Sequence, residues 1–378
     1  MNSPLKHRAI SRQLTIEITA GKYTKTGRLP SEAQLVKRFN VSRPTVGRAM
    51  RELHEQGLIE RRAGSGTYIR TEKDRSRSAQ TTIPQIGLLM PSQRHTEIFE
   101  PICGELASLA RVKDYGLWWG DNVPFASETH MTAAEAETLC ERFIERGVVG
   151  VFFAAFEHQN DCEATNQRIT DLLKKAGIPV VLLDRDIGVF PNRSEFDIVG
   201  VDNVAGGYLL ANHLIKLGVR RMVYVKRPLT APTVDSRIIG AQKALLDNGL
   251  QMPQPFVYSG DPADVKFVTS FAQNQEIDAV LCTNDHLAAE LLQTLTRIGI
   301  RVPKSLRLVG FDNVRFASLL SVPLTTVEQP VRDIAVTAFS ALLERMTDSA
   351  LPPRTLILTP RLVVRESCGA YLYQSRSS

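Results

Sequence analysis

Carboxylate and amide side chains follow several short apolar segments of this chain, at the points where those segments end. Asp184 follows VVLL, Asp312 follows RLVGF, and Asn284 and Asp285 follow AVLCT. If the apolar segments are parallel strands, these side chains lie at the carboxyl edge of a sheet, where open α/β sheets bind ligands. Such groups suit a polyhydroxylated ligand, because each can exchange hydrogen bonds with several hydroxyl groups. We favour ligand contact for Asp184 and Asp312.

The same pattern has a structural alternative, since Asp and Asn also cap helix N-termini. Asp202 and Asn203 follow IVGV and are expected to open the next helix. For Asn203 and Asp285 a cap role is at least as good an explanation as ligand contact. Trp118 and Trp119 follow the predicted second strand of the main domain, where alternation directs only one of them inward. One of the pair is a candidate for stacking on a sugar ring, and core packing is expected of the other.

A second group of chemically capable residues lies within the first 70 positions. Arg43 begins a predicted helix and can donate two hydrogen bonds to guanine O6 and N7, worth about 1–3 kcal/mol of base discrimination. Ser42 and Thr45 suit phosphates or base edges. Gly64 and Gly66 allow a loop backbone to approach a partner closely.

Several chemistries have no sequence support. The chain has no phosphate-binding P-loop, no nucleophile elbow and no H-E-x-x-H, and its seven histidines show no metal-ligand spacing. Its five cysteines contain no C-x-x-C pair, which favours reduced thiols over a zinc site or a disulfide framework. We therefore expect no catalytic residue, metal or cofactor. No segment resembles a secretory signal or a membrane span of about 20 apolar residues, so we expect a cytoplasmic protein without membrane contact.

The residues around Arg43 are organised as a predicted winged helix-turn-helix. Helical spacing runs from Leu5 to about Ala20, a second helix follows Ser31, and a third follows Ser42 with Pro44 in its first turn. Ser31 with Gln34 makes a capping-box pattern. Two short β-type segments, LIERR and TYIR, then enclose AGSG. A helix, a short turn, a recognition helix and a hairpin place the third helix in a DNA major groove.

The remaining chain alternates predicted helices and strands. Four helical segments end in Gly and are followed by β-branched runs, as a parallel α/β layout requires. Almost 300 residues are more than one sheet usually holds, so two lobes are expected. The predicted organisation is a DNA-binding domain at 1–70, a polar linker at 71–84, a two-lobed domain at 85–367 and a tail at 368–378.

The charge is unevenly distributed between these parts. The whole chain carries +6, yet residues 1–78 hold 17 lysines and arginines against 7 acids, a net +10. The rest, with 29 basic and 33 acidic residues, carries −4. A small basic head on a mildly acidic body is typical of a polyanion-binding module joined to another domain.

The segment GRLPSEAQLVKRFNVSRPTVGRAMRELHEQGLIERRAGSGTYIR resembles the DNA-binding domain of GntR-family bacterial transcription regulators. The resemblance covers about the first 70 residues. It implies contact with double-stranded DNA by a set of residues around the third helix and the wing: Ser31, Ser42, Arg43, Thr45, Arg48, Arg62, Gly64 and Ser65.

Two positions depart from the family pattern. Gly47 stands where the family usually has arginine, and Arg48 follows one residue later. One residue rotates a helix by about 100°, so Arg48 is expected to meet a phosphate rather than the base. Ala33 replaces a residue that is often basic. Both departures bear on which sequence is read.

A second resemblance runs collinearly from about Gln85 to Arg365. The segments SRIIGAQKAL, CTNDHLAAELLQTL and RLVGFDNVRFASLLSVPLTTVEQP, among others, are similar to the effector domain of LacI-family repressors. That resemblance implies two Rossmann-like lobes of the periplasmic-binding-protein type, hinged around a ligand cleft. It assigns effector contact to Asp184, Arg237, Asn284, Asp312 and Gln329. Arg237 lies in an R-x-x-G pattern, where an unpaired guanidinium suits hydroxyl or carboxylate binding.

Together the two resemblances are typical of a subgroup of bacterial arabinose-responsive repressors. They imply an operator-binding repressor, dimeric, whose DNA binding responds to a small sugar or sugar-like effector. A sugar receptor of a transport or sensing system is the alternative, but it would not need a basic winged head. An enzyme and a single-strand or RNA binder were also considered; the latter would want more aromatics among the basic residues. Neither the effector, the operator sequence nor the direction of the response follows from the sequence.

Overall fold

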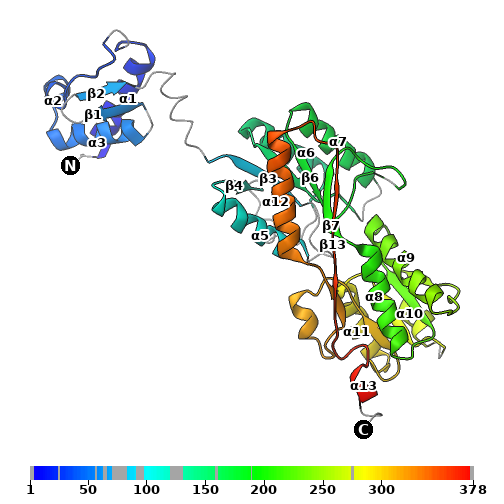
Figure 1. Ribbon diagram of the computed structural model, residues 1–378. Coiled ribbons are helices and arrows are strands. Elements are labelled where there is room, and N and C mark those ends of the chain that lie inside the picture. The colour runs from blue at the N-terminus through cyan, green and yellow to red at the C-terminus, as the bar shows by residue number, and fades with distance from the viewer. Residues whose placement is uncertain are drawn as a thin grey trace. The chain divides into compact units, whose positions relative to one another are not determined.

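The computed structural model describes residues 4–23, 26–55, 58–62, 66–69, 83–90, 98–119, 131–157, 161–188, 190–273 and 276–374. The chain forms two units, Met1–Ile83 and Pro84–Ser378, which are drawn together in Figure 1. Most of the predicted linker lies outside the described residues. None of the described helices is long and apolar enough to cross a membrane.

The first unit is the winged helix-turn-helix that the sequence predicts. Its helices are α1 (Pro4–Thr19), α2 (Glu32–Phe39) and α3 (Arg43–Glu55), and β1 (Ile59–Arg62) pairs antiparallel with β2 (Gly66–Ile69). The predicted capping box is present at the start of α2. The backbone N–H of Gln34 donates to Ser31 Oγ at 3.3 Å, and the backbone N–H of Ser31 donates to Gln34 Oε1 at 2.8 Å.

One apolar cluster holds this unit together. Its fully buried members come from all three helices and from β1: Leu14, Leu35, Val46, Met50, Leu53 and Ile59. Val46, Met50 and Leu53 form the apolar stripe of α3. Burying side chains of this kind stabilises a small domain by roughly 1.5–3 kcal/mol each, so the cluster fixes how α3 is presented.

The second unit begins with a parallel six-stranded sheet in the order β13-β7-β6-β5-β3-β4. Its strands are β3 (Gln85–Leu89), β4 (Gly116–Trp118), β5 (Gly150–Phe153), β6 (Val180–Leu183), β7 (Asp197–Val201) and β13 (Thr355–Leu358). One face is covered by α5 (Phe99–Val112) and α12 (Val331–Thr347), and the other by α6 (Ala133–Arg146) and α7 (Cys162–Lys175). This is the first lobe.

The second lobe repeats the layout with a four-stranded parallel sheet in the order β11-β10-β8-β9. Its strands are β8 (Met222–Lys226), β9 (Val257–Ser259), β10 (Ala279–Cys282) and β11 (Arg307–Val309). Helices α8 (Asn203–Lys216) and α9 (Pro232–Asp247) cover one face, and α10 (Val265–Ala272) and α11 (Asp285–Arg297) the other. A short helix, η2 (Arg315–Ser318), follows β11.

The chain passes between the lobes three times. It crosses after β7 into α8, after β12 (Thr326–Glu328) into α12, and after β13 into β14 (Arg361–Val363). Strands β12 and β14 pair antiparallel with each other at the base of the second lobe. Figure 1 shows these crossings as neighbouring segments between the two sheets. The two-lobed parallel α/β architecture predicted from the sequence is therefore present.

Two expectations about packing differ from the structure. The predicted tail was placed from residue 368, but Cys368 is fully buried in the core of the second lobe, and α13 (Tyr371–Gln374) follows it. Trp118 packs edge-on against Phe143 on one face of the first sheet, with Arg146 over its ring, and Trp119 packs on the opposite face. Neither tryptophan lines the two cavities at the cleft.

Candidate functional site

The five residues predicted for the effector cleft line a single cavity between the lobes of the second unit. Asp184 follows β6, Arg237 lies on α9, Asn284 precedes α11, Asp312 follows β11, and Gln329 lies on the second crossing. They converge because parallel strands of both lobes direct their carboxyl ends toward the same gap. Their role as effector ligands stays a prediction.

Asp184 is the acid of the first lobe in this cavity. Its side chain is 8% exposed, and its backbone has a positive φ of 68°. Arg185 Nη1 lies 3.4 Å from Asp184 Oδ2, whereas Oδ1 has no hydrogen-bond partner in the described part of the chain. Burial raises the pKa of Asp184, because the neighbouring arginines only partly offset the loss of solvent. Asp184 Oδ1 is thus a buried acceptor facing the cavity.

Arg237 is held on three sides. Its Nε donates to Asn203 Oδ1 at 2.8 Å, its Nη1 donates to the Thr283 carbonyl at 2.6 Å, and its guanidinium lies 3.7 Å from the centre of the Phe311 ring. The expectation of an unpaired guanidinium is wrong. Because these contacts fix the planar group, its remaining N–H groups have a set direction.

The residues that cap the helices differ in part from those expected. Asp202 caps α8 by accepting from the Ala205 N–H at 2.8 Å, so Asn203 is free to hold Arg237. Asn284 caps α11, since its Oδ1 accepts from the Leu287 N–H at 2.9 Å. The residue beside it, Asp285, is fully buried.

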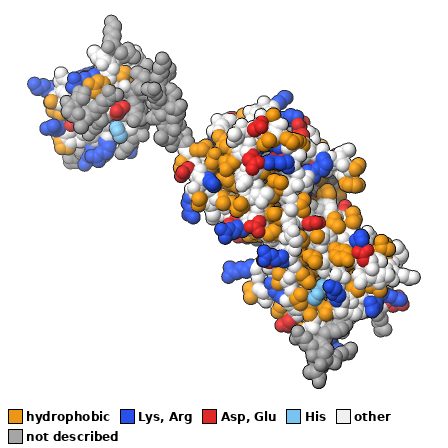
Figure 2. Space-filling model, in the orientation of Figure 1, with side chains coloured by type: hydrophobic (Ala, Val, Ile, Leu, Met, Phe, Trp, Pro, Cys, Tyr) orange, Lys and Arg blue, Asp and Glu red, His pale blue; other side chains and the backbone are white. Residues whose placement is uncertain are grey.

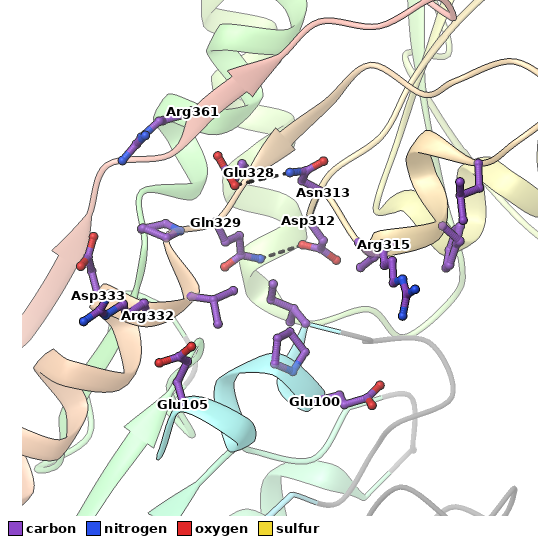
Figure 3. A pocket seen from close by; sticks show the side chains of 17 residues that line it. Glu100, Glu105, Asp312, Asn313, Arg315, Glu328, Gln329, Arg332, Asp333 and Arg361 are labelled. Atoms are coloured by element: carbon purple, nitrogen blue, oxygen red, sulfur yellow. Dashed lines mark hydrogen bonds between the residues drawn. The ribbon is translucent and has the colours of Figure 1, made fainter. Parts of the chain in front are cut away.

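Asp285 has a structural role. It accepts hydrogen bonds from the Val314 N–H at 3.0 Å and the Thr326 hydroxyl at 2.6 Å. Burial, and then the negative charge of nearby Asp312, raise the pKa of Asp285 well above its ordinary value. Asp312 itself accepts from Gln329 Nε2 at 2.7 Å (Figure 3).

Sequence reasoning missed two further acceptors in the cavity. Glu157, 8% exposed, pairs with Arg185 Nη1 at 2.9 Å and accepts from the Ala231 N–H of the other lobe at 3.2 Å. Thr230 Oγ1 is buried with no hydrogen-bond partner among the described residues. Glu157 comes four residues after β5, so the strand-end rule could have found it with a wider window. The remaining lining residues are Ile98, Arg185, Arg227, Thr233, Val234, Thr283, His286 and Leu287.

The inner cavity is almost closed. Its volume is about 30 Å³, enough for roughly one or two waters. An outer cavity of about 1110 Å³ adjoins it and shares Ile98, Asp312 and Gln329 with it. Figure 3 shows this outer cavity, with Glu100 and Glu105 of α5 on the side opposite Asp312 and Gln329. The Glu157–Ala231 hydrogen bond joins the two lobes beside the inner cavity, which is too small for a molecule larger than a few waters.

At the start of α3, Ser42 and Arg43 are exposed and Thr45 is half-buried. The Arg43 side chain is 82% exposed, with only a 3.9 Å contact to Glu32. The hydroxyl groups of Ser42 and Thr45 are hydrogen-bonded to each other at 2.8 Å, and Arg48 is exposed. Figure 2 shows basic side chains on the surface of this unit. Gly64, Ser65 and the Arg62 side chain lie outside the described residues, and the Ser31 hydroxyl is occupied by the capping box.

An ion pair between buried Glu17 and exposed Arg38, which the sequence did not signal, joins α2 to α1. Glu17, 7% exposed, accepts from Arg38 Nη1 at 2.9 Å and from the Tyr23 hydroxyl. The Arg38 guanidinium lowers the pKa of Glu17 to about 2. Lys22 Nζ lies 3.3 Å from the same carboxylate. The pair spans 21 residues of sequence, so no local pattern reveals it.

Family comparisons match each unit separately. Residues 6–69 match the family described as bacterial regulatory proteins, gntR family. Residues 211–368 match the periplasmic binding protein-like domain. In the described part of the chain, no group of three or more His, Cys, Asp or Glu residues could hold a metal ion.

Curated relatives are transcriptional repressors. The HTH-type transcriptional repressor PurR of Aliivibrio fischeri is 28% identical over 213 residues, covering 54% of this chain and 62% of that protein. This chain thus matches less than two thirds of the length of that repressor. The arabinose metabolism transcriptional repressor of Halalkalibacterium halodurans is 26% identical over 374 residues, covering 96% of both chains.

Solved structures share the fold. The transcriptional regulator CelR–cellobiose complex superposes with a TM-score of 0.64 at 23% identity, covering 86% of this chain and 91% of that one. A LacI family transcriptional regulator from Enterococcus faecium with bound ribose gives 0.60 at 24% identity, covering 75% and 98%.

Proposed function

We propose that this chain, which joins a GntR-type DNA-binding domain to a LacI-type periplasmic-binding-protein-like domain, is a transcription repressor controlled by a small sugar. One observation carries the effector role. Asp184 Oδ1 and Thr230 Oγ1, from opposite lobes, are two of the four buried side-chain atoms without a hydrogen-bond partner in the described chain, and both line the inner cavity. Leaving such atoms unsatisfied costs about 1–3 kcal/mol each, and ligand hydroxyls would satisfy them.

The cavity suits a neutral polyhydroxylated ligand. Its lining contains three carboxylates and three guanidinium groups, so their formal charges cancel: Glu157, Asp184 and Asp312 against Arg185, Arg227 and Arg237. Asp184 offers an acceptor and Arg237 offers donors of fixed direction, a combination that hydroxyl groups can match. A pentose is the first candidate, because the relative covering 96% of the chain is an arabinose metabolism repressor.

Control of DNA binding follows from movement of the two lobes about the cleft. A ligand that binds one arrangement of the lobes better than another shifts the balance between them. We propose a homodimer whose two heads bind the halves of an operator, so that a change between lobes alters how the heads meet DNA. Arg43, Ser42 and Thr45 are the proposed reading residues, with Arg48 on the DNA backbone.

Fluorescence anisotropy with the full chain and its operator tests this function. L-arabinose, D-ribose or a related neutral sugar should change operator affinity, and should raise the stability of the chain by about 2.7 kcal/mol at 100 times its dissociation constant. A panel of neutral sugars that alters neither operator affinity nor thermal stability would contradict the effector assignment. Binding to DNA that ignores sequence would contradict the repressor assignment.

A further inference from the structure

Asn313, the residue after the proposed effector ligand Asp312, sits in an unusual stretch of backbone. Asp312 has a φ of 106° and Asn313 a φ of 53°, so two consecutive residues other than glycine adopt positive φ. Such conformations persist where surrounding contacts hold them in place. The contacts of Asn313 therefore bear directly on where Asp312 points.

The amide of Asn313 joins two side chains of opposite hydrogen-bonding character. Arg365 Nη2 donates to Asn313 Oδ1 at 2.6 Å, and Asn313 Nδ2 donates to Glu328 Oε1 at 3.4 Å. Arginine can only donate and an ionised glutamate can only accept, so the orientation of the amide is fixed. An amide at 313 suits both neighbours at once, which a carboxylate or an apolar side chain would not.

The two neighbours belong to different crossings. Glu328 ends β12 and directly precedes Gln329 on the second crossing, while Arg365 lies two residues beyond β14, which the third crossing enters. Arg365 also donates to the Leu324 carbonyl at 2.8 Å, so it is anchored in the second lobe. The side chain of Asn313 thus connects both chain segments next to Asp312, and Figure 3 shows its hydrogen bond to Glu328.

Asp312 is held by the same crossing through its own groups. Its N–H donates to the Val327 carbonyl at 2.8 Å, and its carboxylate accepts from Gln329 Nε2 at 2.7 Å. A shift of β12 relative to Asn313 would carry the backbone and the side chain of Asp312 with it. The Asp312 carboxylate and the second crossing are therefore expected to move together.

We propose that Asn313 is a positioning residue which, through Glu328 and Arg365, fixes Asp312 against the second and third crossings and so links effector binding to movement of the lobes. The inference rests on the proposed function, in which Asp312 binds the effector. Asn313 itself lines only the outer cavity, so it acts through Asp312 and not by touching the ligand of the inner cavity.

The variant Asn313→Gly in the full chain distinguishes the role of the side chain from that of the backbone conformation. Glycine adopts a φ of 53° without steric cost, so the substitution removes both hydrogen bonds and keeps the loop path. Affinity for the sugar probes L-arabinose and D-ribose should fall about three- to ten-fold, as expected for lost hydrogen bonds, while operator affinity without sugar stays unchanged. Equal probe affinity in Asn313→Gly and wild type overturns the proposal.

Glu328 provides the matched control. Glu328→Ala should reproduce the loss, and Glu328→Gln, which keeps an oxygen acceptor, should restore most of it. The double variant Asn313→Gly/Glu328→Ala should bind the sugar no more weakly than the weaker-binding single variant does. Both substitutions remove the same hydrogen bond, so their effects should not add. Fully additive losses, or no rescue by Glu328→Gln, would contradict a shared contact.

Amide hydrogen exchange without ligand keeps this inference separate from the proposed function. Exchange at 312–314 and 327–329 should speed up about three- to ten-fold in Asn313→Gly, while β8 and β10 keep their protection. If wild type binds neither sugar, the proposed pentose class fails and exchange alone decides on Asn313. Unchanged exchange in these segments, or equal loss in β8 and β10, overturns the positioning role.

Discussion

At the scale of single residues, Asp184 is the acid that the cleft leaves least satisfied. It lies in a buried cluster with Glu157 and Arg185, in which Arg185 contacts both acids. Arg185 is further fixed by donating to the Ala155 carbonyl at 2.8 Å. The cluster therefore holds one oxygen of Asp184 in place and leaves the other to a ligand.

Asp184→Ala should lower sugar affinity about 10- to 100-fold, because hydrogen bonds to charged groups contribute about 1.5–3 kcal/mol. Operator affinity without sugar should not change, since Asp184 lies in the second unit. Isothermal titration calorimetry with the responding sugar measures the first quantity and anisotropy the second. Asp171→Ala, an exposed acid on α7, is the control. An unchanged sugar affinity would remove Asp184 from the site.

Glu17 gives the DNA-binding unit a defined response to acid. Its pKa falls from 4.5 to about 2 on folding because Arg38 pairs with the carboxylate. A lowered pKa in the folded state stabilises the unit above about pH 4.5, and this stabilisation is lost as pH falls toward 2.

Glu17→Gln should destabilise the unit by about 1.5–3 kcal/mol at pH 7, and the difference from wild type should shrink as pH falls through this window. Hydrogen exchange of the α1 and α2 segments in the full chain measures it. A difference that stays constant between pH 7 and pH 3 would show that the carboxylate charge is not responsible.

The residues predicted as effector ligands line one cavity, but the sequence did not reveal their hydrogen-bond partners. The strand-end rule brought Asp184 and Asp312 to one cavity because it depends only on topology. Arg237 was expected to be unpaired. Its partners Asn203 and Phe311 were missed because they are distant in sequence and contact it only in the folded lobe. Thr230 carried no signal, because a threonine in a loop has many ordinary roles.

At the scale of elements, α3 presents Arg43 and Arg48 in different directions. Five residues along a helix correspond to a rotation of about 140°, so the two guanidinium groups cannot meet the same feature of DNA. Gly47, between them, has no atom within 4 Å of the position a Cβ would take. The surface of α3 is therefore open at the position where the related family usually has arginine.

Arg43→Ala should relax base discrimination by about 1–3 kcal/mol at one operator position. Arg48→Ala should weaken binding to all sequences alike and reduce the salt slope by about one. Anisotropy with the operator and single-base variants distinguishes the two effects, and Gly47→Ala serves as a control for helix stability. The reverse pattern, with Arg48→Ala changing base preference, would exchange the two roles.

Helix ends were predicted better than crossings. Gly147, Gly177, Gly218 and Gly299 were each expected to end a helix, and all four have positive φ. That signal is local, because only glycine adopts this conformation readily. The pairing of β12 with β14 has no such signal, since each strand has three residues and the partners are 33 to 37 positions apart. The buried position of Cys368 depends on the same long-range packing.

At the scale of the whole molecule, the proposed ligand residues are tied to the crossings. Arg237 is held by Asn203 just after the first crossing, and Asp312 by Gln329 on the second. Asn313 adds a contact to Arg365 beyond the third. A ligand that draws Arg237 and Asp312 together therefore acts on the segments whose geometry sets the angle between the lobes.

The uneven charge predicts that salt acts on the two binding events differently. The 17 basic residues within positions 1–78 give this part of the chain a positive charge that attracts DNA phosphates, whose counterions are released on binding. With about 6–10 phosphate contacts, raising salt from about 50 to about 200 mM should weaken operator binding by about 10³–10⁵-fold. The effector cavity is buried and its formal charges balance, so screening by salt has little access to it.

Sugar affinity of the full chain should therefore change by less than about two-fold over the same range. Paired titrations of operator and sugar at each salt concentration measure both. A sugar affinity that fell in parallel with operator affinity would indicate a charged ligand, and would contradict the neutral class assigned from Asp184 and Arg237. An operator affinity insensitive to salt would contradict DNA binding through the basic head.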